Sequence, residues 1–95
     1  MAESELKVSN RTRTRALAGS ISKTFQSGNT PVLRAVGAQA VSQAVKGIAL
    51  AVSFLEQRGQ TLTCVPSFIS VPNLRTLDDT QYDEITCMLF HLKAS

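Results

Sequence analysis

Three arginines at alternate positions are the first residues in this sequence whose type and spacing could do chemistry. They stand in the run Arg11-Thr12-Arg13-Thr14-Arg15. A guanidinium group presents a planar fork of N–H donors that matches the oxygens of a phosphate. A strand is predicted to end before the run and a helix to begin within it. Free backbone amides at the helix start, capped in part by Thr12 or Thr14, would then face the same anion.

The charge is distributed unevenly along the chain. The net charge is +3, which permits contact with an anionic polymer without requiring it. Residues 11–34 hold five basic side chains and no acidic one, whereas residues 73–84 hold four acids and one arginine. Arginine at a helix N-terminus opposes the helix dipole, so stability alone does not favour it there. The alternative is an ordinary solubilising surface. No aromatic residue interleaves with the arginines, so base stacking is not indicated.

Residues for catalysis or metal binding are scarce. The chain has one histidine, His91, and two cysteines, Cys64 and Cys87, each within an apolar run. No phosphate-cradling glycine motif and no zinc-protease motif occurs. We expect two reduced core thiols, no metal, no cofactor and no enzymatic activity. Neither an apolar leader nor a bilayer-length apolar stretch is visible, so we expect a cytoplasmic protein without membrane contact, nucleoid-associated if bacterial.

Hydrophobic periodicity predicts six elements in the order βαβαββ. The predicted strands cover residues 6–9, 32–36, 61–71 and 84–92, and the predicted helices run from 12 or 14 to about 27 and from 39 to 57. Residues 1–4 are expected to be a disordered tail, and 5–95 a single domain. Pro66 and Pro72 cannot donate to a ladder, which predicts an edge position for the third strand.

The second helix is apolar or small over a wide arc. One stripe contains Val41, Val45, Ile48, Val52 and Leu55, and a neighbouring stripe contains Ala40, Ala44, Gly47, Ala51 and Phe54. Such a helix packs on more than one surface. One is the sheet, and the other is the first helix or a partner subunit. The predicted fold is α+β: a two-layer sandwich whose mixed four-stranded sheet carries both helices on one face.

Several segments resemble the stage V sporulation protein S (SpoVS) family. The residues that carry the resemblance are Leu6-Lys7-Val8-Ser9, Ala16-Leu17-Ala18-Gly19, Leu62-Thr63-Cys64-Val65-Pro66-Ser67-Phe68 and, above all, Val36-Gly37-Ala38-Gln39-Ala40-Val41-Ser42-Gln43-Ala44-Val45-Lys46. That family is in turn similar to the Alba proteins, which are small, dimeric and bind DNA or RNA. The resemblance implies a last strand inserted between the second and third. It also implies a homodimer or higher oligomer.

The resemblance also implies where nucleic acid would bind. In Alba-like proteins the turn from the first strand into the first helix carries basic residues, and the turn into the second helix contributes. The implied contacts, with flanking basic residues, are Lys7, Asn10, Arg11, Arg13, Arg15, Arg34 and Gln39. The turn into the second helix has no arginine here, and the last hairpin is acidic where Alba has a basic arm. Binding that is weaker or differently placed than in Alba, or no binding, is therefore expected.

The sequence thus predicts a non-enzymatic protein that binds the phosphate backbone of DNA or RNA, with a regulatory role in sporulation or development. The alternative is a protein–protein regulatory or assembly module without direct nucleic-acid binding. This alternative is based on the second helix, which is apolar or small on two neighbouring stripes, and on the acidic hairpin.

Overall fold

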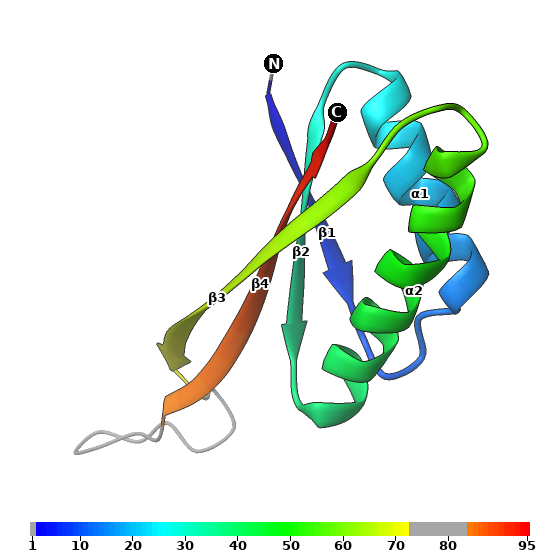
Figure 1. Ribbon diagram of the computed structural model, residues 1–95. Coiled ribbons are helices and arrows are strands. Elements are labelled where there is room, and N and C mark those ends of the chain that lie inside the picture. The colour runs from blue at the N-terminus through cyan, green and yellow to red at the C-terminus, as the bar shows by residue number, and fades with distance from the viewer. Residues whose placement is uncertain (1, 73–83) are drawn as a thin grey trace.

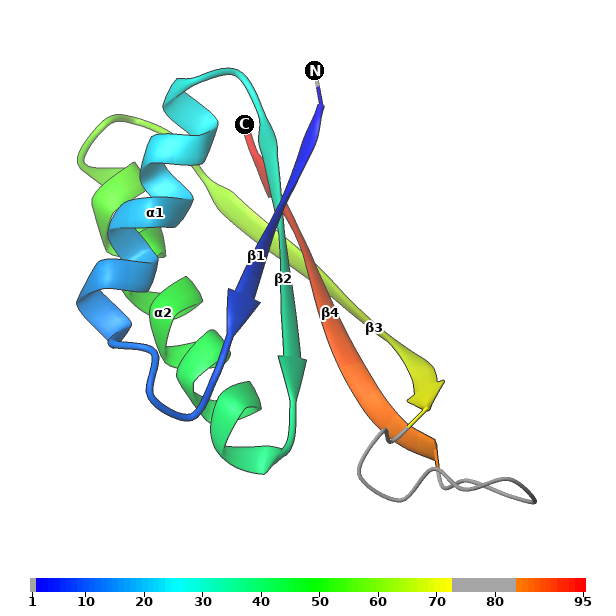
Figure 2. The same cartoon turned by 180° about the vertical axis from the view of Figure 1, so that it is seen from behind.

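Two helices pack on one face of a four-stranded sheet (Figures 1 and 2). The computed structural model describes residues 2–72 and 84–95. The elements are β1 (Glu3–Val8), α1 (Thr14–Gln26), β2 (Thr30–Val36), α2 (Ala38–Glu56), β3 (Leu62–Pro72) and β4 (Glu84–Ala94). This arrangement confirms the predicted α+β sandwich. The predicted acidic turn between the last two strands lies outside the described residues.

The strand order is β1-β2-β4-β3, so the last strand is inserted between the second and third, as predicted. β1 and β2 run parallel, and β4 is antiparallel to both of its neighbours. β3 lies at the edge, which confirms the interpretation of its prolines. Pro66 pairs with Phe90 and Pro72 with Glu84 in an unbroken ladder. Because the two prolines are six residues apart, their nitrogens point to the same side of β3, and that side is the outer edge.

The N-terminal strand is longer than the sequence indicated. β1 begins at Glu3, which pairs with Thr30, and the Thr30 amide donates to the Ala2 carbonyl over 2.9 Å. The prediction of a disordered tail over residues 1–4 is therefore wrong for Glu3 and Ser4. The physical reason is that β2 also begins earlier than predicted, at Thr30, and supplies backbone partners for the extra residues of β1.

The first helix presents one apolar face to the sheet. Leu17 and Ile21 are buried and Phe25 is half-buried, which confirms the predicted stripe. The helix ends at Gln26, and Gly28 follows with a φ of 85°, a left-handed conformation that glycine adopts at little cost.

The second helix uses its small residues as the buried face. Four of its five buried residues are alanine or glycine, and the full set is Ala40, Ala44, Gly47, Ala51 and Leu55. Gly47 lies directly against Leu17 of α1. Contrary to the expectation of no bilayer-length apolar stretch, α2 is long and apolar enough to cross a membrane by length and composition, with a mean hydropathy of 1.3. In this fold the small residues of the same helix pack on the sheet and on α1, and its larger valines stay exposed or half-buried.

Candidate anion-binding site

The carboxyl ends of β1 and β2 lie at the same edge of the sheet because the two strands are parallel. Each strand leads there into a helix, so α1 and α2 both begin at this end of the molecule (Figure 1). An open pocket of about 520 Å³ lies at this edge. We call it the edge pocket, and it is lined by Lys7, Val8, Ser9, Asn10, Arg34, Val36, Gly37, Ala38, Gln39 and Ala40.

The β1–α1 turn (residues 9–13) is closed by its own hydrogen bonds. The Ser9 amide donates to Thr12 Oγ1 over 2.8 Å, and the Thr12 amide donates to the Ser9 carbonyl over 3.2 Å. The Arg11 amide donates to Ser9 Oγ over 3.1 Å. Because the Thr12 hydroxyl is used within the turn, it does not cap α1, contrary to the prediction.

Both helices begin without a side-chain cap. The N-cap residue of α1 is Arg13 and that of α2 is Gly37, and neither makes a capping hydrogen bond from a side chain. Neither first turn contains an acidic residue. Gly37 has a φ of 92°, which glycine tolerates and other residues rarely adopt. Two sets of helix N-terminal amides therefore face the same end of the molecule, and each favours an anion.

The seven predicted contact residues fall into two neighbouring groups. Four of them line the edge pocket, namely Lys7, Asn10, Arg34 and Gln39. The other three, Arg11, Arg13 and Arg15, lie on the turn and the start of α1 and are exposed. Within residues 2–72 and 84–95 these three make no ion pair. The structure therefore gathers the predicted residues at one end of the fold.

Arg34 is the most constrained cation at this edge. Its Nη1 lies 3.4 Å from Glu5 Oε1, with side-chain exposures of 37% and 50%. The Cys87 thiol beside it, and then the Glu5 carboxylate, raise the pKa of the guanidinium. An exposed pair of this kind contributes little stability. Glu5 offsets part of the charge that Arg34 would offer to an anion, whereas Lys7 makes no ion pair among the described residues.

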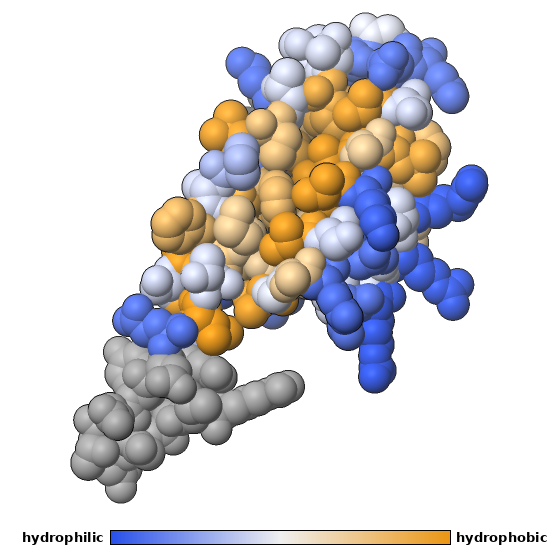
Figure 3. All heavy atoms as spheres, turned by 60° about the horizontal axis from the view of Figure 1, so that its bottom comes forward, coloured by the Kyte–Doolittle hydropathy of each residue, from blue (hydrophilic) through white to orange (hydrophobic). Residues whose placement is uncertain are grey.

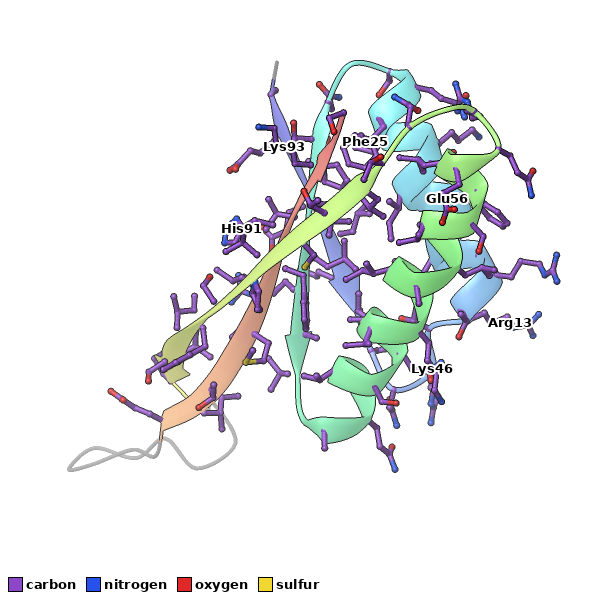
Figure 4. All side chains as sticks on the ribbon, in the orientation of Figure 1. Arg13, Phe25, Lys46, Glu56, His91 and Lys93 are labelled. Atoms are coloured by element: carbon purple, nitrogen blue, oxygen red, sulfur yellow. The ribbon has the colours of Figure 1, made fainter. Side chains whose placement is uncertain are left out.

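Two residues of α2 at this end of the molecule were not predicted as site residues from the sequence. Gln43 Nε2 donates to the Thr12 carbonyl over 2.6 Å, and Lys46 is exposed further along the helix. Gln39, Gln43 and Lys46 are spaced by four and three residues, which places them on one side of α2. Figure 4 shows Lys46 and Arg13 at the same end of the helical layer. The spacing of these three polar residues could have indicated a polar side of α2 from the sequence. The prediction considered only the apolar sides of the helix.

Within residues 2–72 and 84–95, the other reactive residues do not assemble into a site. No group of three or more metal-ligating side chains comes together in the described part of the chain. Ser67 Oγ lies 3.0 Å from His91 Nε2, an exposed hydrogen bond between neighbouring strands. Cys64 and Cys87 are free thiols, and partial burial raises the pKa of Cys64. Its thiolate, the nucleophilic form, is therefore disfavoured.

The fold and this edge define a class: a two-layer α+β protein consistent with the Alba-like superfamily, in which an open basic turn meets two helix N-termini. Within that class, a family model described as stage V sporulation protein S (SpoVS) matches residues 4–93. The chain belongs to the SpoVS family. This family is not a known enzyme family, and membership points to a sporulation-related role.

Proposed function

We propose that this protein is a non-enzymatic, cytoplasmic nucleic-acid-binding protein that contacts the phosphate backbone. The observation that carries the proposal is the convergence at one edge of two uncapped helix N-termini with exposed arginines. Backbone amides and guanidinium groups are the donors that phosphate oxygens accept most readily in protein–nucleic acid complexes.

The aromatic side chains favour backbone and shape recognition over base stacking. Phe90 is buried in the core, Phe25 and Phe54 pack against it, and Phe68 lies on β3. None of these four lines the edge pocket. A binding surface without an aromatic platform suits a duplex, DNA or RNA, whose bases are already stacked.

The proposal is tested by titrating the full chain against labelled duplex DNA, duplex RNA and single-stranded oligonucleotides over a salt series. We expect the logarithm of the binding constant to fall linearly with the logarithm of salt concentration, with a slope of about −0.9 per phosphate contact on duplex DNA. Duplexes should bind more tightly than single strands of the same length. Absence of binding at low salt, or an affinity that salt does not change, would contradict the proposal.

An apolar surface on α2 favours a second candidate function, which is assembly with another copy of the chain. Val41, Val45, Ile48 and Val52 form a stripe, the valine stripe, and all four are exposed or half-buried. Val45 is 51% exposed. The stripe contains no charged residue, so two copies can approach it without like-charge repulsion.

The sheet beside the valine stripe is left partly uncovered. Ala35, Met88 and Phe68 form one row across β2, β4 and β3, on the face that the helices cover. Ala35 is 1% exposed, Met88 is half-buried and Phe68 is 67% exposed. The helices therefore cover one end of this row and leave the other open, and Figure 3 shows the apolar band that results.

We propose that a second copy covers this surface, with the valine stripe of each protomer on the open strand row of the other. A two-fold arrangement of this kind is self-complementary, since each chain offers both a helix and an uncovered strip of sheet. The outward-facing prolines of β3 disfavour the rival mode of pairing through the sheet edge. Sedimentation equilibrium would also detect any association of such dimers into higher oligomers.

Val45→Glu is expected to convert the assembly into monomers, because it places one charge per chain in an apolar interface. Sedimentation equilibrium over a concentration range measures the change. Ser53→Glu adds the same charge at an exposed position outside the valine stripe and should leave the assembly intact. A wild-type chain that stays monomeric at all concentrations would rule out this second function.

A further inference from the structure

We infer that Gln43 is a positioning residue for the proposed nucleic-acid site: it holds the β1–α1 turn against α2 without itself contacting phosphate. The inference rests on the proposed function. It assigns a role to a residue of α2 that lies outside the lining of the edge pocket.

The contact joins distant parts of the chain. Gln43 Nε2 donates to the carbonyl of Thr12 over 2.6 Å, and 31 positions separate the two residues. The hydrogen bond is part-buried, so water competes with it less than with a surface bond. The other side-chain link between the turn and α2, from Asn10 Nδ2 to Gln39 Oε1, is exposed and 3.4 Å long. Gln43 therefore makes the stronger of the two links.

The internal hydrogen bonds of the turn and the Gln43 bond have different consequences. Ser9 and Thr12 close the turn on itself, which fixes its local shape. They do not fix where the turn lies relative to α2. Gln43 does, and it acts at Thr12, the residue between Arg11 and Arg13. Anchoring this one carbonyl restricts the backbone from which both guanidinium groups extend.

The bond also turns an unfavourable group away from the anion. A backbone carbonyl carries partial negative charge and would repel a phosphate that approached it. Because the Thr12 carbonyl is engaged by Gln43 in a part-buried position, it points toward α2. The start of α1, with Arg13 as its uncapped N-cap, then presents donors.

Gln43→Met tests the inference, because methionine has nearly the length of glutamine and keeps the packing while removing the donor. Nucleic-acid affinity should fall about three- to tenfold, the effect of one net hydrogen bond. The salt slope should stay unchanged, because no phosphate contact is removed. Amide hydrogen exchange at Arg11 to Arg13, measured without nucleic acid, should become faster. Gln57→Met makes the same chemical change at an exposed position after α2 and should alter none of these quantities.

The outcomes separate the inference from the function on which it rests. If alanine at Arg11 and Arg13 leaves binding unchanged, the proposed function fails. If those variants weaken binding while Gln43→Met behaves like Gln57→Met in affinity and exchange, the positioning role fails and the function stands. A salt slope that falls with Gln43→Met would mean a direct phosphate contact and would also overturn the inference. Gln43→Asn, which keeps the amide but shortens its reach, gives the same test should the methionine variant fold poorly.

Discussion

Replacing Arg11 and Arg13 together with alanine is expected to weaken duplex binding about a hundredfold near physiological salt. Each guanidinium should lose a charge-assisted hydrogen bond to phosphate, and two bonds of roughly 1.5 kcal/mol each give that factor. The slope of the salt dependence should fall by about two, one for each lost contact. Fluorescence anisotropy over a salt series measures both quantities.

The matched control is Lys23→Ala with Arg58→Ala. Both are exposed cations, and they line a second pocket by the end of α1 and the residues that follow α2, away from the β1–α1 turn. This pair removes the same total charge as the arginine pair. We expect its affinity to stay within a few-fold of the wild type, since charge alone acts weakly at that distance. If both double variants lose the same amount of affinity, binding depends on net charge alone. The β1–α1 turn would then not be the binding site.

Gly47→Ala is expected to destabilise the fold by up to about 2 kcal/mol, although alanine is the better helix former by about 1 kcal/mol. An added Cβ would lie 2.5 Å from Leu17 Cδ2, 2.8 Å from Cγ and 3.2 Å from Cβ. Three atoms of one side chain are too close, so a change of the terminal rotamer cannot relieve the clash. α1 and α2 must separate, and overpacking of this kind typically costs about 1–3 kcal/mol. Urea denaturation of variant and wild type measures the difference.

Gly19→Ala is the control variant, and we expect it to raise the free energy of unfolding where Gly47→Ala lowers it. Gly19 lies in α1, it is exposed, and a Cβ there meets nothing within 4 Å. Alanine should therefore stabilise by about 0.5–1 kcal/mol through backbone entropy. Both variants must be compared at equal protein concentration, because self-association would add to the apparent stability. Equal shifts in the two variants would refute the close helix contact at Gly47.

Most of the fold could be predicted because each element carries its own local signal. The spacing of Leu17, Ile21 and Phe25 identified α1 and its inner face. Proline at 66 and 72 placed β3 at an edge, because a missing N–H is a property of the residue in any context. The strand order with β4 inserted centrally rested on the family resemblance, since no local pattern specifies which distant strands pair.

The site could be predicted only in part, because its geometry depends on contacts between distant residues. The exposed arginines were visible as an acid-free run in the sequence. The bond from Gln43 to Thr12 was not, since glutamine has no preference that reveals a partner 31 positions away. Glu5 beside Arg34 was missed for the same reason, because the two meet only when β1 and β2 pair in register. The Thr12 hydroxyl could accept a hydrogen bond either from an amide of the β1–α1 turn or from an amide at the start of α1. In the structure it accepts from the Ser9 amide of the turn.

The two prolines of β3 have a consequence that no single molecule displays. Within one chain they cost the ladder with β4 nothing, since every pair from Leu62 to Pro72 is formed. Their effect arises only when many copies meet at high concentration, where an open strand edge would template growth from one chain to the next. Two missing donors along that edge interrupt such growth. The prolines therefore disfavour growth of an aggregate from the β3 edge of one copy to the next.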